Sequence, residues 1–173
     1  MEGLLDEKER NENALQRCLT ENPILFGTEY ARVIPKHRLG DEYEMDYALE
    51  RVSGLVDLVE IEASTHPLFT QAGNPRKELV HAEQQVIDWL DWIEQHGEYA
   101  RHRLPGLMQP LGYVIIGGTL GMSEEERKRL HRRNSMFRGA LQILTYDDLL
   151  DRARTLLQIL EGKVSVSRSA EAS

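Results

Sequence analysis

The sequence predicts an α/β domain with a mixed central sheet that contains an antiparallel hairpin and is flanked by helices. Two observations lead to this fold class. Segments follow one another in the order helix, three strands, helix, strand, helix, strand, helix, which is typical of a mixed sheet with helices on its faces. Two of the strands are separated only by Ser53-Gly54, which favours an antiparallel hairpin. The 173 residues suit one core. We therefore expect one domain over residues 1–161 and a disordered tail over residues 162–173.

The N-terminal part is expected to contain one helix and one strand. Residues 3–20 place their apolar side chains on one side of a helix among many charges. Pro23 ends this helix, because proline disfavours helical geometry in the residue before it. Residues 30–34 are expected to form a first strand that ends at Pro35, and the polar residues 36–41 are expected to form a turn.

The hairpin is expected to join residues 44–52 to residues 55–62. Successive side chains of a strand point to opposite faces. Glu60 and Glu62 therefore share one face of the second strand, and Asp46 is expected to meet them from the first strand. The opposite face is expected to hold Met45, Tyr47, Val59 and Ile61.

The middle of the chain contains the clearest helical pattern. After a loop at residues 63–77, apolar residues recur with a period of 3.6 over residues 77–95. Residues 96–111 are rich in glycine and proline and are expected to be irregular. The apolar residues 113–116 are expected to form a buried central strand.

Two helix starts are predicted in the last third of the chain. Ser123 and Glu126 have the spacing of a capping box, which begins a helix over residues 124–137. A short strand over residues 141–144 follows. Thr145 is expected to cap a last helix that reaches residue 160.

The charge balance limits how the chain can bind nucleic acid. The formal net charge is −8, so a nucleic-acid site must be a local patch. The helix over residues 124–137 supplies such a patch, and its candidate phosphate-contacting residues are Arg127, Lys128, Arg132 and Arg133. The alternative is a solvated face that balances the acidic residues 124–126.

Other classes of protein are disfavoured. Cys18 is the only cysteine, which excludes an internal disulfide and a thiolate zinc cluster. The acidic start of the chain lacks the apolar stretch of a signal peptide, and no apolar run has the length of a membrane span. We therefore expect a cytoplasmic protein with no membrane partner.

The acidic face of the hairpin is the main candidate for chemistry. Like charges on a strand as apolar as residues 55–62 are unfavourable unless a cation compensates them. Hard divalent cations prefer oxygen ligands, so Asp46, Glu60 and Glu62 are candidate metal ligands. Gln85 lies on the helix that follows and is a candidate polar anchor. The alternative is an acidic surface exposed to solvent.

At this hairpin the chain resembles the PD-(D/E)xK nucleases, a superfamily with a restriction-endonuclease-like core. Asp46 matches the aspartate of the first strand and Glu60 matches the acidic residue of the second. Gln85 begins a segment similar to the RecB-type Gln-containing motif, with Trp89 in the place of its tyrosine. Over residues 22–157 the chain more closely resembles the nuclease domain of the Shedu anti-phage defence proteins. The similar segments are Asn22-Pro23, LVEIE at 58–62, Leu68-Phe69, ELVHAEQQVIDW at 78–89, VIIG at 114–117 and TYDDLL at 145–150.

The resemblance implies a metal-dependent DNA endonuclease in antiviral defence. Asp46 and Glu60 would hold Mg²⁺ or Mn²⁺, and Gln85 would help to position the substrate or a ligand. DNA would be the partner, and the family likeness makes a homo-oligomer the expectation. The alternative is a catalytically inactive nuclease fold that binds DNA or mediates protein assembly.

Glu62 departs from the superfamily pattern, because it stands where lysine is usual. A carboxylate cannot supply positive charge to a phosphate. Three possibilities remain open at this point. Glu62 could be a further metal ligand, with a second cation taking the role of the lysine. Lys36 or Lys77 could supply the charge instead. The site could also be inactive.

Overall fold

A single five-stranded sheet forms the centre of the molecule. The structure, a computed structural model, describes residues 12–163. The strands lie side by side in chain order, β1, β2 and β3 pairing antiparallel and β3, β4 and β5 parallel. They are β1 (Tyr30–Leu39), β2 (Tyr43–Arg51), β3 (Val56–Ile61), β4 (Gly112–Ile115) and β5 (Leu141–Leu144). The predicted mixed sheet with an antiparallel hairpin is confirmed.

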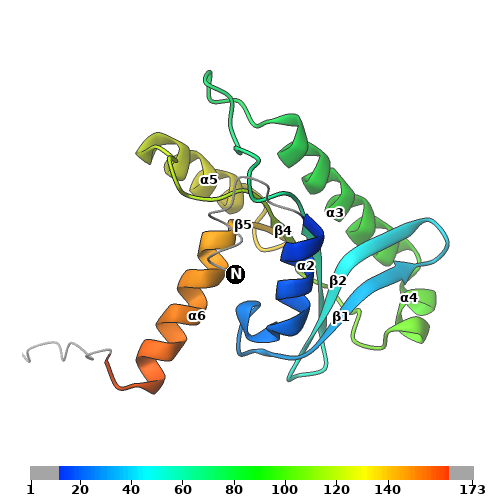
Figure 1. Ribbon diagram of the computed structural model, residues 1–173. Coiled ribbons are helices and arrows are strands. Elements are labelled where there is room, and N and C mark those ends of the chain that lie inside the picture. The colour runs from blue at the N-terminus through cyan, green and yellow to red at the C-terminus, as the bar shows by residue number, and fades with distance from the viewer. Residues whose placement is uncertain (1–11, 164–173) are drawn as a thin grey trace, which may run out of the picture.

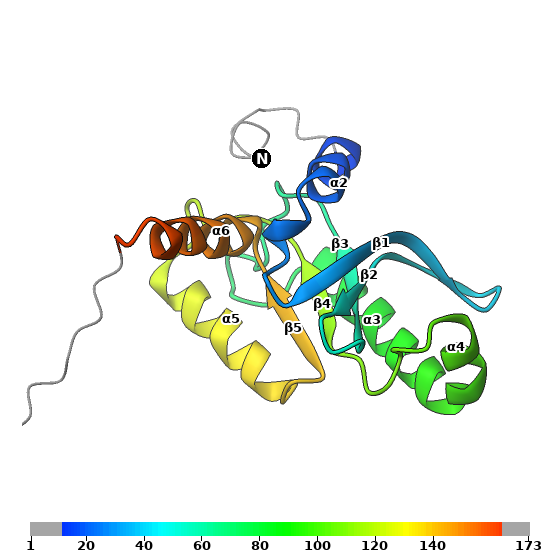
Figure 2. The same cartoon turned by 90° about the horizontal axis from the view of Figure 1, so that it is seen from below.

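Helices cover both faces of the sheet (Figures 1 and 2). They are α2 (Glu12–Glu21), α3 (Lys77–Gln95), α4 (Gly97–Arg103), α5 (Glu124–Met136) and α6 (Tyr146–Leu160), with a short 3-10 turn, η1 (Pro23–Leu25). In Figure 2, α2 and α6 lie above the strands, and α3 and α4 lie below them. Within residues 12–163, no helix combines the length and the apolar character that crossing a membrane requires.

The predicted ends of the chain are described only in part. The helix expected over residues 3–20 is observed as α2 from Glu12 onward. Residues 3–11 of that prediction lie outside the described residues. Most of the predicted disordered tail, residues 164–173, lies outside them as well.

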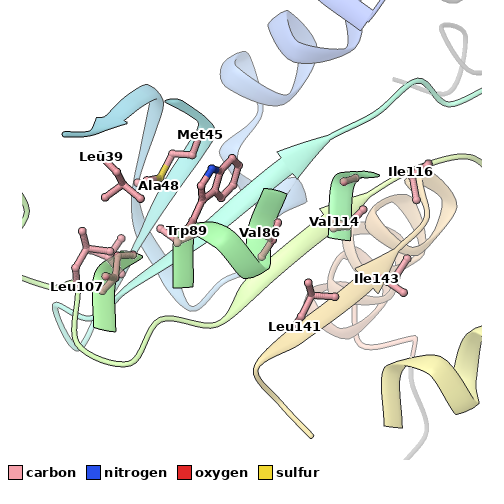
Figure 3. Packing of buried hydrophobic residues seen from close by; sticks show 14 of the residues in the cluster. Leu39, Met45, Ala48, Val86, Trp89, Leu107, Val114, Ile116, Leu141 and Ile143 are labelled. Carbon is pink, nitrogen blue, oxygen red and sulfur yellow. The ribbon is translucent and has the colours of Figure 1, made fainter. Parts of the chain in front are cut away.

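The larger core lies between α3 and the sheet. Apolar side chains of α3 are buried at the predicted helical spacing, because that period places them on one side of the helix. Figure 3 shows Val86 and Trp89 among side chains from several strands. The strand residues in this cluster include Met45, Ala48, Leu58, Val114, Leu141 and Ile143. This packing holds α3 against the sheet that carries the acidic hairpin.

The second core lies on the opposite face, under α2 and α6. It contains Tyr47, Val59 and Ile61, as predicted, but not Met45, which packs on the α3 face with Ala48. The prediction that Met45 and Tyr47 share a face is therefore wrong. Pairing of β2 with β3 begins at Tyr47, so the residues before it are paired only with β1 and can follow a stronger twist.

The predicted turn at residues 36–41 is also wrong, because β1 continues through Pro35 to Leu39. The turn is confined to residues 40–42. β1 is an edge strand, and proline is tolerated there since no neighbour needs its missing N–H. Lys36 adopts a φ of +51°, while pairing with β2 continues on both sides of it.

The prediction of irregular structure over residues 96–111 misses α4. This short helix is polar apart from Tyr99 and Ala100, and it buries Ala100. It therefore has no apolar stripe that a periodicity argument could detect. Burial of Ala100 against the rest of the fold outweighs the weak helix propensity of this segment, which begins with glycine.

Local signals in the last third of the chain are confirmed. Both α5 and α6 begin with a capping box, formed by Ser123 with Glu126 and by Thr145 with Asp148. The open edge of β5 is covered by Asn134, whose side chain donates to the Ile143 carbonyl at 2.9 Å and accepts from its N–H at 2.7 Å. An exposed edge strand can recruit other chains, and Asn134 occupies the middle of this one.

Candidate active site

Asp46 and Glu60 lie on neighbouring strands, at the same end of the β2–β3 pairing. Tyr47 with Val59 is the last pair between β2 and β3 at this end, so Asp46 and Glu60 are the next residues of the two strands. Both residues are largely buried, with 9% and 8% of their surface exposed. Asp46 is also fixed to β3, because its Oδ2 accepts a hydrogen bond from the Ile61 N–H at 2.9 Å. The two predicted residues are therefore both buried near the same end of the β2–β3 pairing.

The second oxygen of Asp46 is held by two other elements. Lys36 Nζ, from β1, lies 2.5 Å from Asp46 Oδ1. Gln16 Nε2, from α2, donates to the same oxygen at 3.0 Å. The main chain at Gln16 is in turn held by the Tyr47 hydroxyl, which donates to its carbonyl at 2.6 Å. Two buried carboxylates repel one another, and the ammonium group of Lys36 offsets part of that repulsion.

Glu62 differs in its surroundings. β3 ends at Ile61, so Glu62 is the first residue after the strand. Its N–H donates to the Ile115 carbonyl at 2.8 Å, and its own carbonyl accepts from the Tyr146 hydroxyl at 2.8 Å. Its carboxylate lies 3.7 Å from Nδ1 of His66. The main chain at Glu62 is thus anchored to β4 and α6, and its side chain lies beside His66.

The predicted three-carboxylate metal site is not gathered in the described part of the chain. Across residues 12–163, no three acidic, histidine or cysteine side chains lie close enough to hold one ion. Gln85 is half-buried on α3, and no hydrogen bond joins it to Asp46, Glu60 or Glu62. Asp46 and Glu60 nevertheless fit a hard divalent cation, since Mg²⁺ is often bound by one or two carboxylates together with waters and phosphate.

The predicted basic patch on α5 divides into two parts. Arg133 makes a two-pronged ion pair with Glu83 of α3, which exposes only 3% of its surface. The hydrogen bond to Glu83 raises the pKa of Arg133. The exposed basic side chains of α5 form surface contacts instead. These are Lys128 with Glu124 at 2.7 Å, Arg132 with Glu125 at 3.3 Å and Arg127 with the Thr119 carbonyl at 3.3 Å.

Comparison with known protein families finds a match for this chain. Residues 9–150 match the family described as Shedu protein SduA, C-terminal. The chain belongs to this Shedu family. The match covers the hairpin with Asp46 and Glu60, helix α3 and the start of α6. The resemblance to Shedu predicted from the sequence is therefore confirmed.

Two solved structures are similar to this Shedu-family chain. One, described as the structure of an EndoMS-dsDNA2 complex, is 11% identical, with 78% of this chain and 44% of that chain covered and a TM-score of 0.46. The other, a repair endonuclease from Pyrococcus abyssi, is 15% identical, with coverages of 81% and 48% and a TM-score of 0.46. The chain thus spans about half the length of either structure. No curated protein matches it.

Two residues of this Shedu-family site carry little signal in the sequence. Gln16 lies beside Leu15 in α2, where one polar residue next to an apolar stripe is unremarkable. Lys36 falls in a segment predicted to be a turn. The only signal for it in the sequence is the glutamate at position 62, where lysine is usual. Its pairing with Asp46 follows from the continuation of β1, which the sequence did not predict.

Proposed function

We propose that this Shedu-family domain hydrolyses phosphodiester bonds of DNA with Mg²⁺ or Mn²⁺ as its cofactor, as part of antiviral defence. The observation that supports this most strongly is the placement of two buried carboxylates, Asp46 and Glu60, on neighbouring strands at the same end of their pairing. Burial disfavours the charged form of a carboxylate, and a bound divalent cation favours it. The proposed ligands are Asp46 and Glu60, since Glu62 lies beside His66.

The proposed reaction is the transfer of a phosphoryl group to water. A bound metal ion would lower the pKa of a water molecule and neutralise charge on the phosphate. The water oxygen forms a bond to phosphorus and loses a proton. The bond from phosphorus to the leaving oxygen breaks, and that oxygen takes up a proton. The products are a phosphomonoester and an alcohol. Asp46 is held at both oxygens, so its carboxylate is already oriented before substrate binds.

The exposed part of α5 is the proposed contact with the DNA backbone. Arg127, Lys128 and Arg132 form only surface contacts, which phosphates can replace at little cost. Arg133 is less suited to this role, because its guanidinium group is committed to Glu83. Removing one phosphate-contacting charge is expected to weaken binding for all DNA sequences and to reduce its salt dependence.

A cleavage assay with matched variants tests the function. Linear and circular plasmid DNA are incubated with Mn²⁺ and the wild-type protein, Asp46→Asn, Glu60→Gln or Glu44→Gln. Glu44 lies on β2 but is exposed and pairs with Arg38, so its variant serves as the control. We expect wild type and Glu44→Gln to cut both substrates, and the other two variants to lose at least about 100-fold in rate. Wild type that cuts no faster than Glu60→Gln contradicts the proposal.

A second candidate is an inactive nuclease fold that binds DNA or mediates assembly. The carboxylate of Glu62 at the usual position of a lysine favours it. In that case DNA binding in a gel-shift assay would be equal for wild type and Glu60→Gln, and neither would cut DNA with Mg²⁺ or Mn²⁺. Binding without cleavage would therefore replace the first proposal with this one.

A further inference from the structure

We propose that Lys36 is the positive group of this site and donates a hydrogen bond to the scissile phosphate, in place of a lysine at position 62. The reaction itself rests on the proposed function. The assignment of Lys36 to the Asp46 and Glu60 site rests on the geometry and can be tested without cleavage.

The need for a positive group follows from charge. A phosphodiester is an anion, and it must approach two buried carboxylates. Negative charge also builds up on the phosphate oxygens during attack by water. Fixed hydrogen-bond donors and cations at that position stabilise the transition state more than the ground state. One metal ion offsets only part of this charge, so a further positive side chain beside the carboxylates is favourable.

Lys36 is the side chain in that position. Its Nζ lies 2.5 Å from Asp46 Oδ1, while 54% of its side chain is exposed. The group is therefore held beside the carboxylate of Asp46, and about half of its side chain is accessible to solvent. The ammonium group acts as a hydrogen-bond donor and keeps its proton, so that no bond to Lys36 is made or broken.

The backbone of Lys36 is unusual in a way that supports a functional role. Its φ of +51° lies in the left-handed region, although β1 pairs with β2 on both sides of it. A residue with a Cβ atom is disfavoured in this region. Such conformations persist at functional sites, where the surrounding structure holds them. This conformation interrupts the regular alternation of β1 at the residue whose side chain reaches Asp46.

The other lysine that could replace position 62 is less well placed. Lys77 exposes 91% of its side chain and lies 3.6 Å from Glu78 at the start of α3. Glu62 itself lies beside His66. Arg38, two residues after Lys36, pairs with Glu44 on the exposed side of the hairpin. The geometry therefore selects Lys36.

The first test is single-turnover cleavage of linear plasmid DNA with saturating Mn²⁺. Lys36→Met is expected to slow cleavage by about 100-fold or more, as for loss of one transition-state donor. Lys36→Arg retains the charge and is expected to lose much less. Lys77→Met is the matched control and is expected to remain within about twofold of wild type. Circular dichroism melting establishes that each variant is folded.

Moving the charge gives a second test. In the double variant Lys36→Met with Glu62→Lys, a lysine returns to the position that is usual in the superfamily. We expect this double variant to cut at least about tenfold faster than Lys36→Met alone. A double variant no faster than the single variant would contradict the idea that the two positions serve the same charge.

The third test needs no cleavage. Mn²⁺ is titrated into the protein without DNA and its affinity is measured by calorimetry. Lys36 competes with the metal for Asp46, so Lys36→Met is expected to bind Mn²⁺ about tenfold more tightly than wild type and Lys77→Met. A structural role would instead weaken binding together with folding. Asp46→Asn is expected to lose most of the affinity.

The outcomes separate the two proposals. If wild type cuts DNA and folded Lys36→Met cuts equally fast, the Lys36 inference is wrong and the proposed function stands. If wild type cuts no DNA, the proposed function is wrong, and the Mn²⁺ titration still decides about Lys36. Tighter binding by Lys36→Met then supports its place in the site, whereas unchanged or weaker binding overturns it.

Discussion

Two buried aspartates lie at opposite ends of the paired part of the β2–β3 hairpin, and their surroundings differ. Each accepts a backbone N–H and lies beside a basic side chain. Asp57 exposes 2% of its surface and accepts from Arg51 Nε at 2.6 Å, the Tyr30 hydroxyl at 2.8 Å and the Leu111 N–H at 3.0 Å. Asp46 is more exposed and is held by Lys36, Gln16 and the Ile61 N–H.

The difference agrees with a structural role for Asp57 and with the functional role proposed for Asp46. The partners of Asp57 come from β1, β2 and the segment before β4. This carboxylate of β3 therefore links three neighbouring parts of the sheet. At Asp46 the basic partner is a lysine with a positive φ on an edge strand. Removing one partner of a buried ion pair lowers the free energy of unfolding strongly, because the other charge is left buried and unpaired.

The largest expected effect is the loss of stability when Asp57 rather than Asp46 is replaced by alanine. Asp57→Ala leaves Arg51, Tyr30 and the Leu111 N–H without their common partner and is expected to lower the free energy of unfolding by about 3 kcal/mol. Asp46→Ala removes the contacts with the Ile61 N–H, Gln16 and Lys36, but Lys36 is half-exposed and water can solvate it, so the expected loss is smaller, about 1 kcal/mol. Urea unfolding measures both. Equal losses would remove the distinction between the two aspartates.

A third buried carboxylate extends the comparison. Glu83 resembles Asp57, because its two oxygens are paired with Arg133 between α3 and α5. Glu83→Ala is expected to lower the free energy of unfolding by about 2 kcal/mol and to leave the cleavage rate of the folded protein unchanged. Glu125→Ala, which removes an exposed partner of Arg132, is the control and is expected to change stability by less than about 0.5 kcal/mol. A lower cleavage rate in folded Glu83→Ala would assign this residue to the site.

The pH dependence of stability tests the closed network around Asp57. Burial raises the pKa of Tyr30, and Tyr113 and Asp57 raise it further. The unfolded chain then releases this proton more readily, at a pH near the ordinary tyrosine value of about 10. The contribution of Tyr30 is complete below that pH and is lost as the pH rises through its higher folded value.

Tyr30→Phe therefore removes part of the alkaline loss of stability. We expect this variant to lose about 1 kcal/mol of unfolding free energy at pH 7. Above pH 10 its unfolding free energy is expected to fall less steeply with pH, with a slope that corresponds to about one proton fewer. Unfolding in urea over this range of pH measures the slope. Tyr99→Phe, at an exposed position, is expected to retain the wild-type slope. An unchanged slope in Tyr30→Phe would contradict a tightly closed network at Asp57.

The smallest expected effect tests the strain at Lys36. Glycine adopts a positive φ without penalty, so Lys36→Gly is expected to be more stable than Lys36→Ala by about 1 kcal/mol. At Ala31, an exposed position in the same strand, the order is reversed and glycine is expected to be less stable than alanine by about 0.5 kcal/mol. Thermal and urea unfolding give both differences. The same order at both positions would argue against strain beside Asp46.

The predictions succeeded where the physical cause is local. The apolar period over residues 77–95 matches α3, and the capping residues Ser123 and Thr145 start the last two helices. Both depend on residues a few positions apart. The prediction failed for α4 and for the continuation of β1 past Pro35. The first is stabilised by burial of Ala100, and the second by pairing with β2, neither of which is visible in a short stretch of sequence.

The sequence by itself determined the mixed α/β fold class, the hairpin with Asp46 and Glu60, and the absence of lysine at position 62. Antiparallel pairing of two strands joined by a short turn is enough to put those two residues on neighbouring strands near one end of the hairpin. Only the tertiary structure decided what surrounds them: Lys36 from an edge strand, Gln16 from α2, and Glu62 turned toward His66. These contacts depend on where β1 ends and how β2 twists, since both are settled by packing between distant segments.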